Sequence, residues 1–154
     1  MSLTLYIGRL EKLSARYGAP VTRGPLSAEV SGRVEERRIV LRAGLSLEQQ
    51  MLTLVHELTH LMVHCHAHPK LNRTICEYEA EAVERWVAAE LGVGKTAGDA
   101  LDGAGVTDNL LACSVLRVQW VARRLVNAAR GEDLQSETRA ITDAGRRPDP
   151  GTAR

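Results

Sequence analysis

Five consecutive residues have the types and spacing of a metal site: His56-Glu57-Leu58-Thr59-His60, the H-E-x-x-H pattern. Residues four apart share one face of an α-helix, so both imidazoles can reach a single Zn²⁺ at about 2.0–2.1 Å. Glu57 is rotated away from that pair and can act as a general base on a metal-activated water without being a ligand. The motif therefore indicates metal-assisted hydrolysis of peptide bonds as the candidate chemistry.

The residues around the motif favour a helical setting. His56 and His60 project from the side of the helix opposite to a single apolar stripe. The stripe consists of Met51, Leu54, Val55, Leu58, Leu61, Met62 and Cys65. This amphipathic context makes a chance occurrence of the motif the weaker interpretation.

A catalytic zinc also needs a third protein ligand and an open fourth position, and the sequence offers two routes to that ligand. The metzincin spacing H-E-x-x-H-x-x-G-x-x-H would use His66. Val63, however, stands where this pattern needs a glycine to turn the chain sharply, and a β-branched residue resists that turn. The second route, a glutamate from a downstream helix, is therefore favoured.

The downstream segment CEYEAEAVERW carries four glutamates, which could all belong to a solvated helix face. A helical wheel places Glu79 on the buried stripe and Glu77, Glu81 and Glu84 on the other side. A carboxylate that points into an apolar face is costly unless it is paired or bound to metal. We therefore predict Glu79 as the third ligand, with Glu77 as the fallback, because a modest rotation of the helix would exchange them.

Periodicity and capping signals predict the elements that position these residues. They are a helix over 3–17, a β-hairpin from 28–34 and 37–42, a zinc helix from Leu47 to about Cys65 that starts with a Ser46–Gln49 capping box, a glutamate helix from about Arg73 to Leu91 that ends at Gly92, and a helix from about Asp108 to Arg130. We expect one α+β, zincin-like domain over residues 1–130. In it, a small antiparallel or mixed sheet packs on about four helices, and a flexible tail follows over 131–154.

Composition argues against several other classes of protein. The chain has 154 residues and a formal net charge of +1, so no global field attracts nucleic acid or a membrane surface. No apolar run approaches the roughly 20 residues that span a bilayer, and the N-terminus lacks the pattern of a signal peptide. We expect a cytoplasmic protein in which Cys65, Cys76 and Cys113 are free thiols.

Together, HELTHLMVH and EYEAEAVERWVAAELG resemble the gluzincin-type zinc metallopeptidase domain of the ImmA/IrrE proteins. They are still more similar to the C-terminal metallopeptidase domain of ArdC-type antirestriction proteins. The resemblance covers about Ile39 to Gly92 and implies that an E-A-x-x-V/F-A block supplies the third ligand, which falls on Glu79 by position. Glu84 stands where the family usually has a small residue. Neither a helix-turn-helix reader nor a single-stranded-DNA-binding domain is present, so the resemblance does not imply DNA binding.

Further side chains could assist the site. His64 lies one turn beyond His60, matches a histidine often seen in the resembling family, and could orient the site, stabilise an oxyanion, or simply end the helix. Tyr78 could donate a hydrogen bond to a tetrahedral intermediate or belong to the core. No zinc pattern matches the spacing of His66 and His68. The strand RRIVLR could present an edge to an extended peptide.

These observations predict a zinc-dependent metallopeptidase that acts on a peptide or protein substrate, with His56, His60 and Glu79 as ligands and Glu57 as general base. One alternative is a regulatory zincin that binds a single protein regulator and cuts only that target, or nothing. Another is a metal-free helical interaction module, which the long apolar stripes would suit. The oligomeric state does not follow from the sequence.

Overall fold

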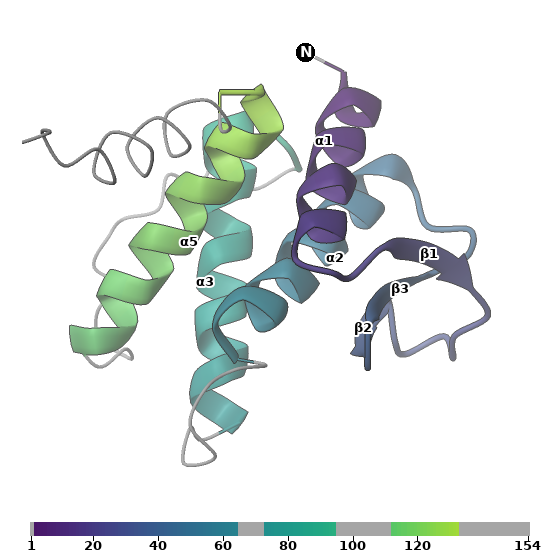
Figure 1. Cartoon of the computed structure of the whole chain (residues 1–154), viewed down its shortest axis with the longest axis horizontal. Coiled ribbons are helices and arrows are strands. Elements are labelled where there is room, and N and C mark those ends of the chain that lie inside the picture. Colours follow the sequence, from purple (N-terminus) through teal and green to yellow (C-terminus); the bar gives the residue numbers. More distant parts are fainter. Residues whose placement is uncertain (1, 65–72, 95–111, 133–154) are drawn as a thin grey trace, which may run out of the picture.

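The structure is a computed structural model that describes residues 2–64, 73–94 and 112–132. Its elements form a small sheet beside a group of helices, so the predicted α+β class is confirmed (Figure 1). In chain order they are α1 (Leu3–Arg16), β1 (Val21–Gly24), β2 (Gly32–Glu35), β3 (Arg38–Arg42), α2 (Leu47–Thr59), the π-helical turn η1 (His60–His64), α3 (Arg73–Leu91) and α5 (Ala112–Arg130).

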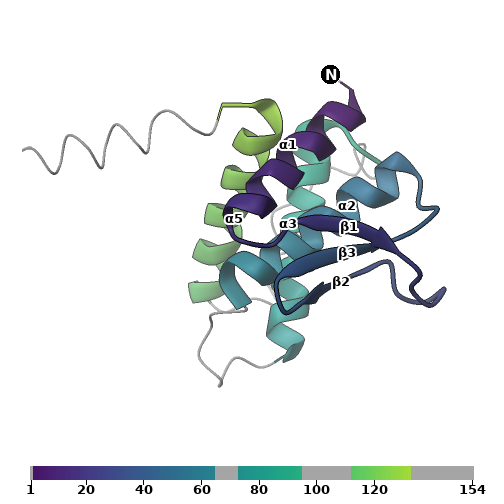
Figure 2. The same cartoon turned by 45° about the vertical axis from the view of Figure 1, so that its right-hand side comes forward.

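The sheet is mixed, with the strand order β1-β3-β2 (Figure 2). Strand β1 pairs with β3 in parallel, and β2 pairs with β3 antiparallel, so that Val34 lies opposite Ile39. The predicted hairpin is thereby confirmed, although its first strand begins only at Gly32. The sequence did not predict β1, because this strand has only four residues and none of them is buried.

Strand β3 occupies the centre of the sheet, which corrects one expectation. Its backbone pairs with β1 on one side and with β2 on the other. The prediction that RRIVLR presents an edge to a peptide is therefore wrong. Within the described ranges, β2 pairs with β3 alone. It also borders the helices that carry the candidate site residues.

Helix α2 lies at the centre of the packing. It contacts β2, β3, α1 and α3, while α3 and α1 both pack against α5. Because the chain has no phenylalanine, aliphatic side chains fill the interior. The largest of the fully buried ones are Leu10, Ile39, Leu41, Met51, Leu54, Leu58 and Leu125.

The start and the end of α2 both bear on the site. The Ser46 hydroxyl accepts the Gln49 backbone N–H at 3.2 Å and the Gln49 side chain accepts the Ser46 N–H at 3.1 Å, as the predicted capping box requires. From His60 to His64 the helix widens into a π-helical turn, a feature that occurs often at functional sites. The predicted helix is thus continuous from Leu47 to His64, and its expected end at Cys65 lies outside the described residues.

The remaining predictions agree where the structure describes the chain. Helix α3 has the predicted bounds, and Gly92 follows it with φ of 65°, a left-handed conformation that suits glycine at a helix end. Cys76 is a free thiol. Cys65, the side chain of Cys113, the predicted helix start near Asp108 and most of the predicted tail lie outside the described residues, and the extent of the domain stays a prediction. None of the described helices combines the length and apolar character needed to cross a membrane.

Gly32 permits the close approach of β2 to α2. A Cβ atom at this position would lie 2.5 Å from Cγ2 of Thr53 and 3.2 Å from Cγ of Glu57. We predict that Gly32→Ala lowers the free energy of unfolding by about 1–3 kcal/mol, because the strand and the helix must separate. Urea denaturation measures this change.

The matched control is Gly8→Ala in α1, where an added Cβ meets nothing within 4 Å. This substitution should stabilise the protein by roughly 0.5–1 kcal/mol, since alanine is the better helix former. Equal stability of Gly32→Ala and the parent protein would contradict the close packing of β2 on α2.

Candidate metal centre

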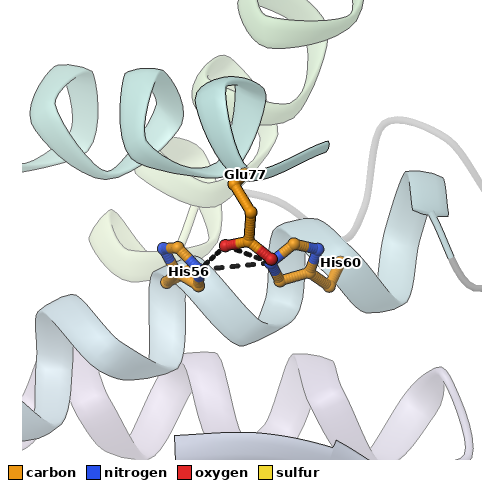
Figure 3. A group of neighbouring side chains, drawn as sticks. All are labelled: His56, His60 and Glu77. Atoms are coloured by element: carbon orange, nitrogen blue, oxygen red, sulfur yellow. Dashed lines mark hydrogen bonds and ion pairs between the residues drawn. The ribbon is translucent and has the colours of Figure 1, made fainter. Parts of the chain in front are cut away.

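Two helices bring His56, His60 and Glu77 together. Figure 3 shows the Glu77 carboxylate of α3 pointing between the two imidazoles, which come from α2 and the start of η1. The Nε2 atoms of His56 and His60 are 3.1 Å apart. Glu77 Oε2 lies 3.4 Å from His56 Nε2 and 3.6 Å from His60 Nε2. The three side chains can therefore offer their ligand atoms to one ion.

These distances fit a tetrahedral metal ion. Zinc bonds of about 2.0–2.2 Å in a tetrahedral arrangement separate neighbouring ligand atoms by roughly 3.3–3.6 Å. The observed separations of 3.1, 3.4 and 3.6 Å form one face of such a tetrahedron. The fourth corner remains for a water molecule or a substrate oxygen, as a catalytic site requires.

Glu79, the first choice from the sequence, does not join this group. Its side chain is 1% exposed, as the helical wheel predicted, but it points to His64 and Arg117. His64 Nε2 lies 3.0 Å from Glu79 Oε2, and Arg117 Nη2 donates to Glu79 Oε1 at 2.6 Å. In the structure the fallback, Glu77, lies beside the histidine pair.

Each histidine of the pair has a second partner at its other ring nitrogen. His56 Nδ1 lies 3.3 Å from Glu84 Oε2, and His60 Nδ1 lies 2.8 Å from His64 Nδ1. A neutral imidazole that donates a hydrogen bond from Nδ1 presents a lone pair at Nε2. Partners of this kind orient metal-ligating histidines, so the surroundings of both rings favour metal binding through Nε2.

The same neighbours set the protonation of the histidines. Burial opposes the charged form of His56, but its hydrogen bond to Glu84 and the nearby carboxylates raise its pKa above the ordinary value. Burial and the adjacent His56 lower the pKa of His60 to about 4. His60 is therefore neutral near pH 7, the form that binds a metal ion.

Glu57 lies next to this group without taking part in it. Its side chain is buried, and burial raises the pKa of its carboxyl group, while the adjacent His56 opposes that rise. A raised pKa brings a carboxylate closer to the range in which a general base works best near neutral pH. The environment of Glu57 therefore suits the predicted base.

An open cleft of about 840 Å³ borders the candidate ligands. Strand β2 and the loop before it form one wall, and α2 and α3 form the other. The lining includes Glu57 and Glu84 as well as all three candidate ligands. Substrate could therefore reach the ligand atoms, Glu57 and the edge of β2 from one side.

Comparison with known proteins identifies the family. Residues 12–112 match the IrrE N-terminal-like domain, Peptidase_M78, and so include both the H-E-x-x-H motif and Glu77. The chain belongs to the IrrE N-terminal-like domain family. The resemblance to the ImmA/IrrE proteins is thereby confirmed, and the family assignment points to a peptidase-type domain. No curated protein and no solved structure matches the chain.

The side chains that the sequence suggested as assisting residues lie in different places. His64 contacts His60 and Glu79, as described above. Tyr78 is 48% exposed and does not line the cleft, so neither of its expected positions, at the site or in the core, is observed. His66 and His68 lie outside the described residues. Arg117 could not be predicted from the sequence, because nothing in the pattern of α5 distinguishes it from the helix's other arginines.

The position of Glu77 leads to a test by metal analysis. We predict that Glu77→Ala weakens the binding of a divalent metal ion by at least about tenfold, since it removes one of three protein ligands. Elemental analysis after dialysis, followed by competition with a chromophoric chelator, measures the loss.

Glu81→Ala is the matched control, because Glu81 is exposed on the same helix and pairs with Arg85. Its metal content should equal that of the parent. Similar metal losses in both variants would argue against a specific role of Glu77.

Proposed function

We propose that this protein is a zinc-dependent metallopeptidase in which His56, His60 and Glu77 hold the ion. The observation that supports this most strongly is the set of ligand-atom separations, 3.1, 3.4 and 3.6 Å, which fits one face of a tetrahedral zinc site. Membership of a peptidase-type family supports the same conclusion.

Zinc is the proposed metal because of the ligand set. Two imidazoles and one carboxylate, with an open fourth position, form a common catalytic zinc site in peptidases. When bound, the ion acts as a Lewis acid that polarises the scissile carbonyl and makes a water molecule more acidic.

Glu57 is the proposed general base. It follows His56 directly in the helix, lines the cleft and does not belong to the ligand group. We propose that its carboxylate accepts a proton from the attacking water and passes it to the nitrogen of the leaving amine.

We further propose that an extended peptide binds along β2. This strand lines the cleft through Gly32, Arg33 and Val34, and within the described residues it pairs on one side, with β3. Main-chain hydrogen bonds to a sheet edge bind peptides of many sequences. Such binding would place the scissile bond beside the ligand atoms and Glu57.

Replacement of the general base tests the proposed reaction. We predict that Glu57→Gln slows zinc-dependent peptide hydrolysis by about 10²–10⁴-fold, because the amide cannot accept the proton. The rate should be measured with a mixture of denatured proteins, since the preferred sequence is not specified. Zinc content should remain at one equivalent.

Glu48→Gln provides the matched control, because Glu48 is exposed in the first turn of the same helix. Its activity should equal that of the parent. If zinc-loaded Glu57→Gln cleaved as fast as the parent, Glu57 would not be the base and the proposed mechanism would be wrong.

A further inference from the structure

Helix α5 contacts the metal centre indirectly, although it lies almost entirely outside the region that matches the family. The match ends at residue 112, the first residue of α5. Arg117, one and a half turns later, reaches Glu79 with two nitrogen atoms. Its Nε and Nη2 donate to Glu79 Oε1 at 3.1 and 2.6 Å. Two donors on one carboxylate form a geometrically specific pair.

From this pair, polar contacts continue without a break to the candidate ligand His60. Glu79 Oε2 lies 3.0 Å from His64 Nε2, and His64 Nδ1 lies 2.8 Å from His60 Nδ1. The side chains of His64 and Glu79 are only 7% and 1% exposed. Water therefore competes little with these contacts, which makes their directions well defined.

Glu79 is the acceptor for both of its neighbours in this path, Arg117 and His64. The guanidinium of Arg117 can only donate, and its hydrogen bonds reach both carboxylate oxygens, so Glu79 is the acceptor of this pair. An ionised carboxylate can only accept, so His64 donates from Nε2. The contact of 2.8 Å between His64 Nδ1 and His60 Nδ1 needs one donor and one acceptor, and in the arrangement in which His64 accepts, His60 donates from its own Nδ1. The remaining nitrogen of His60, Nε2, keeps its lone pair and faces His56 and Glu77.

We propose that Arg117, acting through Glu79 and His64, is a positioning residue that selects the ring orientation and tautomer of His60 suited to metal binding. This inference rests on the proposed zinc site. It assigns to α5 a role in that site which membership of the family does not supply. It also gives the buried Glu79 a role as an acceptor that orients a ligand.

The other histidine has a shorter version of the same arrangement. His56 Nδ1 contacts Glu84 of α3 directly at 3.3 Å, without an intervening histidine. Glu84 is partly exposed, whereas Glu79 is buried. The orientation of His60 thus depends on a longer series of contacts between more deeply buried side chains, and this series reaches a third helix, α5.

Zinc affinity provides a test that does not depend on activity. Arg117→Met removes the donors and preserves much of the side-chain length. We predict that it weakens zinc binding by about tenfold or more, as loss of outer partners of metal ligands usually does. Competition with a chromophoric chelator measures the dissociation constant, and circular dichroism shows that the variant is folded. Arg123→Met, at an exposed position of the same helix, should bind zinc like the parent.

A double-mutant cycle separates positioning from simple packing of α3 against α5. If Arg117 acts through His64, Arg117→Met should cause no further loss of zinc affinity in a His64→Leu background. An equal loss in both backgrounds would overturn the proposed path. Unchanged affinity of the single variant Arg117→Met would overturn it as well.

If Arg117→Met does not fold, Glu79→Gln tests the same series of contacts, because Glu79 lies between Arg117 and His64. The amide keeps the volume of the side chain but not its charge, so we expect weaker zinc binding, and affinity equal to that of the parent would overturn the proposal. A parent protein that binds no zinc would refute the proposed function itself. A parent that binds zinc tightly, with no effect of these substitutions, would refute the positioning role alone.

Discussion

The buried carboxylate of Glu79 constrains the mutual arrangement of α3, η1 and α5. A charge that is 1% exposed costs several kcal/mol unless partners satisfy it, and loss of one partner costs roughly 3–5 kcal/mol. The partners come from two other elements, Arg117 from α5 and His64 from η1. Glu79 can therefore remain ionised in the interior only while the three elements keep their mutual positions.

This constraint explains how α3 contacts the histidine pair with one face and α5 with the opposite face. Residues two apart in an α-helix point about 200° away from each other, so Glu77 and Glu79 face opposite sides. Glu77 lies beside the histidine pair and borders the cleft, whereas Glu79 anchors the helix from behind. The pairing of Glu79 thus helps to fix the rotation of α3 that presents Glu77 to His56 and His60, and it connects the candidate metal centre to the packing of α5.

Much of this arrangement follows from the sequence, because helical periodicity determines which side chains share a face. It predicted the histidine pair, the capping box of α2, the bounds of α3 and the burial of Glu79. Periodicity does not predict which residues pack against each face, since that depends on contacts between residues far apart in the chain. Arg117 lies 38 positions from Glu79, and no local pattern connects them. A buried carboxylate can bind a metal ion or pair with an arginine, and the choice requires tertiary structure.

The central claim is that His56, His60 and Glu77 surround one zinc ion, with Glu79 behind them. A crystal structure of the zinc-loaded protein, with anomalous diffraction recorded at the zinc edge, tests this most directly. We expect a single strong anomalous peak at about 2.0–2.2 Å from both Nε2 atoms and a Glu77 oxygen. A peak coordinated by Glu79 in place of Glu77, or the absence of a peak between the two histidines, would contradict it.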